Sequence, residues 1–158
     1  MAFSTQADLE VALGAQRLLE LADPDDTGDI ADASVVARID GWIEDAAADV
    51  RALVEIKHDP EALAAIDAPS LRRLKRAETD LAARRACEDG GEGFVMPPHV
   101  ELRAKRAEEY LDDLATGRQR LGRVAGGTVA AVSQPAGVID HDALGTKVSM
   151  AGLARGFR

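Results

Sequence analysis

The sequence predicts an all-α protein: a small bundle of four or five helices with an extended C-terminal arm. The chain of 158 residues is 46% hydrophobic but only 3% aromatic, and its alanine- and leucine-rich composition is typical of helices. Apolar residues recur at alternating spacings of three and four, which is the period of one helix face. From Val124 onward this period disappears and glycines become frequent. We therefore expect a helical bundle domain over residues 1–123 and an arm over residues 124–158.

The N-terminal segment predicts a short helix that glycine interrupts. Ser4 and Thr5 are residue types that cap helices, because their side-chain oxygens accept hydrogen bonds from free backbone N–H groups. The stretch QADLEVAL follows them, and Gly14 is expected to separate it from the helical stretch AQRLLELA. An acidic loop over residues 23–31 comes next.

A long helix is predicted from about Ala33 to Lys57, with Asp32 as its N-cap. Its apolar positions follow the alternating spacing for five turns, which indicates a buried stripe. Trp42 and Val35 widen this stripe. The stripe itself consists of Val36, Ile39, Ile43, Ala46, Val50 and Leu53.

Prolines mark the starts of three further helices, because proline is tolerated in the first helical turn. Pro60 is expected to open a short helix capped by Asp59, and Pro69 a longer one that ends near Glu88. Pro98 starts the last helix, after a loop with three glycines. The inward positions expected from the Pro69 helix are Leu71, Leu74, Ala77 or Glu78, Leu81, and Ala82 or Arg85. Those expected from the last helix, which should end at Gly117, are Val100, Ala104, Ala107, Leu111 and Leu114.

Residues 124–158 mix small and apolar side chains with turns, so they cannot build a core alone. We expect an arm that is disordered in the free chain and becomes ordered on another subunit, although a tail without a role is the alternative. The apolar residues expected to contact the partner are Val138, Ile139, Leu144, Val148, Met150, Leu153 and Phe157.

The segment DPDDTGDI has part of the pattern of a calcium-binding loop. Asp23, Asp25 and Thr27 would supply oxygen ligands at positions 1, 3 and 5, and Gly28 falls at position 6. Position 12 is Ser34, however, where such loops need a bidentate glutamate. The pattern therefore favours a turn between helices over a metal site.

No pattern predicts catalysis or a cofactor. His58, His99 and His141 have no partners at the spacing of metal ligands or of a catalytic triad. The single cysteine, Cys87, lies among alanines and is interpreted as a small packing residue. No signal peptide and no apolar run of membrane-spanning length occurs, so the chain is expected to be a soluble protein that is not an enzyme.

The net charge of −9 is unevenly distributed. Residues 1–70 carry 16 acidic and 4 basic side chains, whereas residues 71–123 carry 10 acidic and 12 basic ones. Such a distribution suits contacts between different faces of identical subunits; solvated helix surfaces with no such role are the alternative. Arg72, Arg73 and Arg76 are predicted to pair with acidic residues of a neighbouring subunit; solvated charge and contact with DNA phosphates are the alternatives.

Four stretches together resemble a family of small virion proteins of tailed bacteriophages, typified by a Mu-like head–tail protein. They are TQADLEVALGAQRLLELAD with the acidic turn, VVARIDGWIEDAAADVRAL, DAPSLRRLKRAETDLAARRAC, and PPHVELRAKRAEEYLDDLATGRQRLG. The ending of the last stretch places Tyr110, Leu114, Gly117, Leu121 and Gly122 as in that family. The resemblance covers residues 4–123, and the HDPEALAAI segment is longer than the family's pattern.

This resemblance implies a head–tail connector, or adaptor, with no catalytic residues. It implies a homo-oligomeric ring, usually of twelve subunits, between the portal protein and a stopper or tail-completion protein. The ring would continue the DNA channel without sequence-specific binding, in the virion after assembly in the host cytoplasm. Two alternatives from other classes are a calcium-responsive helical binding module of the cytoplasm and a regulatory DNA-binding helical protein.

Overall fold

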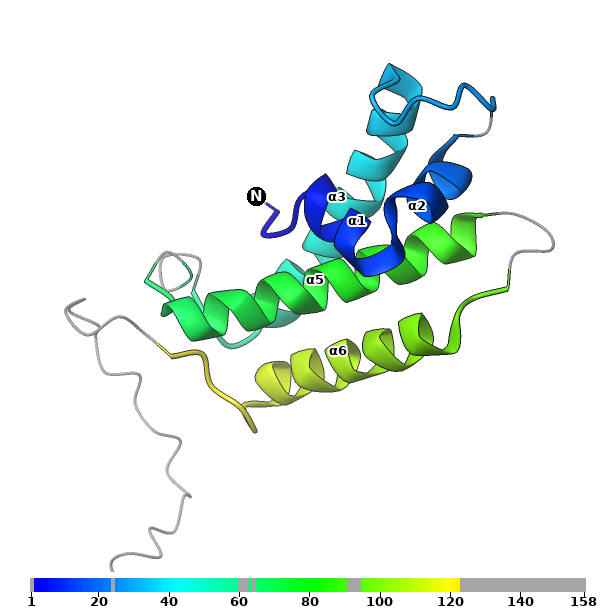
Figure 1. The fold of residues 1–158 in the computed structure, drawn as a ribbon. Helices are drawn as coiled ribbons and strands as arrows, with labels where there is room; N and C mark the ends of the chain where they lie inside the picture. Colours follow the sequence, from blue (N-terminus) through cyan, green and yellow to red (C-terminus); the bar gives the residue numbers. More distant parts are fainter. Residues whose placement is uncertain (1, 24, 60–62, 64, 91–94, 123–158) are drawn as a thin grey trace, which may run out of the picture. The chain divides into compact units, whose positions relative to one another are not determined.

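The computed structural model describes residues 2–23, 25–59, 63, 65–90 and 95–122, and these form an all-helical bundle (Figure 1). The predicted fold class is therefore confirmed. The residues of the predicted arm lie outside the described part of the chain, as does most of the short helix predicted at Pro60. The helices are α1 (Gln6–Leu13), α2 (Ala15–Ala22), α3 (Ala33–Glu55), α5 (Ala68–Asp89) and α6 (Pro98–Thr116).

The two short helices meet at Gly14, whose φ of +90° suits glycine and breaks the helix as predicted. Thr5 caps α1 together with Asp8: the Thr5 backbone N–H and hydroxyl both donate to Asp8 Oδ2, at 2.9 and 2.6 Å. Ser4 has a different role. Its side chain is buried, and its hydroxyl donates to Glu78 Oε1 of α5 at 2.6 Å.

Helix α3 begins where the sequence predicts, because Asp32 accepts a hydrogen bond from the Ser34 backbone N–H at 2.8 Å. It ends at Glu55, slightly before the predicted end. Val54 is buried in place of Leu53, which is only half-buried. A helix of 3.6 residues per turn drifts against a fixed three–four pattern, so the buried face shifts along its length. The buried residues of α3 are Val35, Ile39, Trp42, Ile43, Ala46, Ala47, Val50 and Val54.

Helix α5 is the central element and packs against α1, α2, α3 and α6 (Figure 1). Asp67 caps it by accepting from the Ser70 backbone N–H at 2.8 Å. The prediction that Leu71 faces inward is wrong, since this side chain is 42% exposed. It lies in the first turn of α5, one turn before Leu74, the first fully buried position.

Helix α6 runs antiparallel to α5 and beside it (Figure 1). All five predicted stripe residues are buried, and Gly117 ends the helix with a left-handed φ of +79°. No helix among the described residues is long and apolar enough to cross a membrane.

Candidate interaction site between α5 and α6

Two hollows open on the surface of the bundle, and they differ in how their charges are balanced. The larger, about 530 Å³, lies between α3 and α5. There Arg38 pairs with Asp89 at 2.9 Å, and Arg85 pairs with Asp45 at 3.3 Å and with Asp49. Because both arginines are paired with carboxylates of the same chain, this hollow has little unsatisfied charge with which to attract a ligand.

The smaller hollow, about 270 Å³, lies between α5 and α6 and is lined by arginines. Each helix contributes positions spaced by three and four, which share one face of a helix. Ala77 and Ala107 are buried beneath the charged side chains. We call this site the arginine groove; it is lined by Arg73, Arg76, Ala77 and Asp80 of α5, and by Arg103, Arg106, Ala107 and Tyr110 of α6.

Asp80 is the one acidic side chain in the lining of the arginine groove. Its side chain is only 7% exposed, and Oδ1 pairs with Arg103 Nη2 at 2.5 Å. Arg76 Nε lies 3.9 Å from the other oxygen, Oδ2, and its side chain is 76% exposed. The buried carboxylate therefore holds Arg103 closely, while Arg76 extends into solvent.

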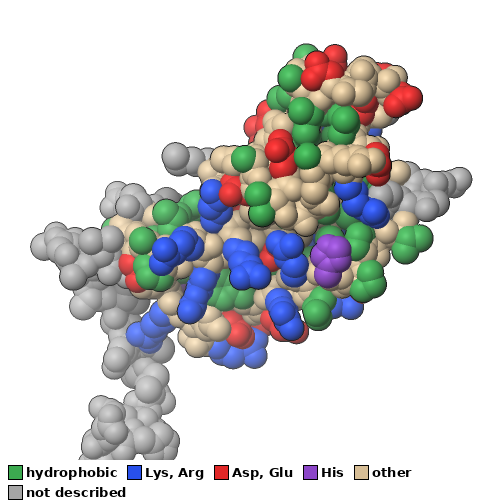
Figure 2. Space-filling model, viewed as in Figure 1, with side chains coloured by type: hydrophobic (Ala, Val, Ile, Leu, Met, Phe, Trp, Pro, Cys, Tyr) green, Lys and Arg blue, Asp and Glu red, His purple; other side chains and the backbone are tan. Residues whose placement is uncertain are grey.

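Arg73 and Arg106 are both exposed, and neither forms an ion pair with any residue in the described part of the chain. Four guanidinium groups thus face one carboxylate, which leaves an excess of three positive charges. Figure 2 shows Lys and Arg side chains gathered over α5 and α6 on one face of the molecule. A surface of this kind attracts carboxylates or phosphates, which arginine binds through two parallel hydrogen bonds.

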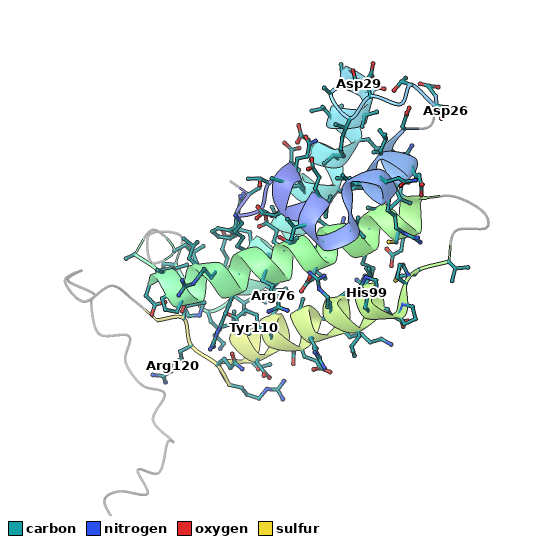
Figure 3. All side chains as sticks on the ribbon, viewed as in Figure 1. Asp26, Asp29, Arg76, His99, Tyr110 and Arg120 are labelled. Atoms are coloured by element: carbon teal, nitrogen blue, oxygen red, sulfur yellow. The ribbon has the colours of Figure 1, made fainter. Side chains whose placement is uncertain are left out.

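Tyr110 adds a neutral hydrogen-bond donor to the arginine groove. Burial raises the pKa of its phenol, although the nearby Arg73 acts in the opposite direction. The hydroxyl therefore stays protonated at neutral pH and can donate to an anion. Figure 3 shows Arg76 and Tyr110 in the region between α5 and α6.

The acidic loop, residues 23–31, leads into the N-terminus of α3 and lies away from the arginine groove (Figure 3). Gly28 has a left-handed φ of +71°, and the loop turns the chain between α2 and α3. The loop is held by its own side chains: Asp23 Oδ2 accepts from the Gly28 N–H at 2.7 Å, and Asp29 Oδ1 accepts from the Ala31 N–H at 2.9 Å.

Two of the residues predicted as possible calcium ligands, Asp23 and Thr27, take part in such hydrogen bonds within the loop. Backbone hydrogen bonds from Thr27 and Gly28 lower the pKa of Asp23. Its carboxylate therefore already accepts hydrogen bonds that stabilise the turn. Thr27 Oγ1 accepts from the Asp29 N–H at 3.4 Å. Calcium would have to replace these donors. Across the described residues, no group of three or more His, Cys, Asp or Glu side chains is arranged to hold a metal ion.

Helix α5 carries Arg72, Arg73 and Arg76, which are predicted to contact a neighbouring subunit, together with other basic residues that pair within the chain. Lys75 pairs with Asp8 at 2.9 Å, and Arg84 with Glu108 at 2.7 Å, so these cations stabilise the bundle itself. Arg73 and Arg76 line the groove, whereas Arg72 is exposed outside it. The predicted arm contacts, from Val138 to Phe157, lie outside the described residues.

Sequence reasoning missed the contribution of α6 to the groove. Arg103, Arg106 and Tyr110 follow the same three–four spacing as Arg73, Arg76 and Asp80. That shared spacing was the available signal, but only the antiparallel pairing of the two helices brings the two sets together. No family model, curated protein or solved structure matches this chain.

Proposed function

We propose that this chain is a structural virion subunit, the head–tail connector or adaptor of a tailed bacteriophage. Copies would form a ring between the portal protein and the tail or stopper, and the ring would continue the channel for the genome. The protein acts by assembly and not by catalysis.

The observation that carries this proposal is the separation of unsatisfied charge onto two different surfaces. The arginine groove has excess positive charge, whereas the acidic loop exposes Asp25, Asp26 and Asp29 at a distance from it (Figures 2 and 3). Identical subunits that meet through two different surfaces form closed rings when the rotation between them closes.

The order of the helices also supports the proposal. The four stretches that resemble the connector family lie, in chain order, on the two short helices α1 and α2, on the long helix α3, on α5 and on α6. The acidic first half of the chain also suits a channel, since carboxylates repel phosphates and allow DNA to slide.

The test uses particles of the phage that encodes the chain. Deleting the coding sequence should leave DNA-filled heads without attached tails, visible by negative-stain electron microscopy, and mass spectrometry should find the chain in intact wild-type particles. Complete, infectious particles assembled without the chain would overturn the proposal.

A further inference from the structure

We propose that the tip of the acidic loop of one copy, Asp25 and Asp26, docks into the arginine groove of the next copy. This inference rests on the proposed function in one respect, because it assumes that the chain assembles with itself. It goes further by naming the two surfaces that meet and the residues that join them.

The arginine groove has positive charge that ion pairs among the described residues neutralise only in part. Asp80 is shared between Arg103 and Arg76, at 2.5 and 3.9 Å. Arg73 and Arg106, one on each side of the groove, therefore form no ion pair with a carboxylate among the described residues. Two carboxylates from a partner would bring the net charge of the lining from three positive to one positive.

The acidic loop has the complementary chemistry. Between Arg17 and Arg38 the chain has six acidic residues and no lysine or arginine. Asp25 and Asp26 are exposed, and their side chains form no hydrogen bond or ion pair with any described residue. They are thus the carboxylates of this loop that can bind a partner without breaking a bond within the chain.

The loop is also held in shape before it binds. Asp23 and Asp29 fix its backbone through the bonds to Gly28 and Ala31, and Asp32 caps α3. Asp26 itself adopts a left-handed φ of +53°, which places two consecutive carboxylates at a tight turn. An ordered loop loses less conformational entropy on binding, so more of the electrostatic attraction contributes to affinity.

We assign the groove to a second copy because the loop is complementary to it in charge, while the two surfaces lie apart on one copy. Figure 3 shows Asp26 and Asp29 at one extremity of the bundle, and Arg76 and Tyr110 away from them, along the middle of α5 and α6. A nucleic acid also carries anions, but the net charge of −9 opposes its approach to the protein. The acidic loop also presents anions, the carboxylates of Asp25 and Asp26, and it belongs to the protein itself.

The experiment reverses the charges of the loop, the charges of the groove, and then both sets together. The loop variant is Asp25→Lys with Asp26→Lys, the groove variant is Arg73→Glu with Arg106→Glu, and the quadruple variant combines them. None of these four side chains pairs with a described residue, so all variants should fold, as circular dichroism can verify. Two control variants change charge by the same amount at exposed positions elsewhere: Asp40→Lys with Glu44→Lys, and Lys57→Glu with Arg120→Glu.

Sedimentation velocity over a concentration series measures self-association of the full chain. We expect the loop and groove variants each to weaken association at least tenfold, and the controls to change it less than threefold. A tenfold change corresponds to about 1.4 kcal/mol. The quadruple variant should recover most of the wild-type association, and an equimolar mixture of the loop and groove variants should associate.

Three results would overturn the inference. One is a wild-type chain that stays monomeric at every concentration tested. Another is association that neither reversal weakens. A third is a groove variant that loses binding to labelled duplex DNA while loop reversal has no effect on self-association, which would assign the groove to phosphates.

Electron microscopy of the same samples separates this inference from the proposed function. Rings that persist in both reversed variants would mean that the contact lies elsewhere while the connector proposal stands. Open filaments that depend on both surfaces would support the contact and contradict the connector ring, because the rotation between copies would not close.

Discussion

Ser4 and Glu78 form a buried contact between residues 74 positions apart: the Ser4 hydroxyl and backbone N–H donate to Glu78 Oε1 at 2.6 and 2.7 Å. The Phe3 backbone N–H donates to the same oxygen at 2.8 Å. A fully buried carboxylate on α5 therefore fixes the segment that leads into α1. Three donors compensate part of the cost of removing this carboxylate from water.

Replacing Glu78 should destabilise the bundle strongly. Glu78→Ala leaves three donors unpaired, the two buried donors of Ser4 and the partly buried N–H of Phe3, and we expect the free energy of unfolding to fall by about 2–4 kcal/mol. Ser4→Ala removes one donor and should cost about 1 kcal/mol. Urea denaturation of the two single variants and the double variant measures their coupling; strictly additive losses would show that the Ser4 hydroxyl and the Glu78 carboxylate are not coupled.

The two arginines beside Asp80 should differ in their effect on stability. Arg103 is bound to a nearly buried carboxylate and is itself 32% exposed, so Arg103→Ala should cost about 2–3 kcal/mol by leaving Asp80 without its close partner. Arg76→Ala is the matched control and should change stability by less than about 0.5 kcal/mol, because that side chain is 76% exposed. Equal losses in chemical denaturation would contradict the assigned roles.

A side chain at Gly122 should displace the carboxylate of Asp67, which caps α5 through Ser70. An added Cβ would lie 2.1 Å from Asp67 Oδ2, while the Asp67 backbone N–H donates to the Gly122 carbonyl at 3.0 Å and holds the two together. We expect Gly122→Ala to lower the free energy of unfolding by about 1–3 kcal/mol. Gly41→Ala is the control with the opposite sign: it has open space around it in α3, and a gain of about 0.5–1 kcal/mol is expected. Thermal denaturation distinguishes the two.

The helix caps should make stability depend on pH at the acidic end. Hydrogen bonds from Ser34 lower the pKa of Asp32, and hydrogen bonds from Ser70 lower that of Asp67, below the ordinary value of 3.8. A lowered folded-state pKa means that the stabilisation is complete above the unfolded-state pKa and is lost as the pH falls below it. Midpoints of urea denaturation should therefore decrease as the pH is lowered from about 5 to 2.

Asparagine at the same caps separates titration from capping. It can still accept the backbone hydrogen bond but does not titrate. The double variant Asp32→Asn with Asp67→Asn should therefore lose less stability than the wild type over the same acidic range. An unchanged dependence on pH would assign the acid sensitivity to other carboxylates.

Cys87 should react slowly with thiol reagents in the folded protein. Its side chain is 4% exposed, and burial raises the pKa of its thiol above the ordinary value of 9.0, so the reactive thiolate is both rare and shielded at neutral pH. We expect Ellman's reagent to label it at least tenfold faster in denaturing urea than in buffer. Rapid labelling of the native chain would show that α5 opens locally around this position.

Much of the fold could be predicted because the spacing of apolar residues along the sequence indicates which face of a helix is buried. The stripe of α6 was predicted completely, and Asp32 and Gly117 marked helix ends through local bonding that needs no distant partner. Leu71 was misplaced because its exposure depends on where neighbouring helices lie, and the local period carries no information about that.

The helices, their caps, the glycine break and the uneven distribution of charge follow from local sequence, since these features depend on residues within a few positions of one another. The packing of the helices, in contrast, sets which charges are neutralised: it pairs Lys75, Arg84 and Arg85 within the chain and brings Arg106 of α6 and Arg73 of α5 into the lining of one groove. The physical reason is that an ion pair or a groove depends on distances of a few ångströms between side chains far apart in the sequence. Those distances are set by the packing of α5 against its neighbours.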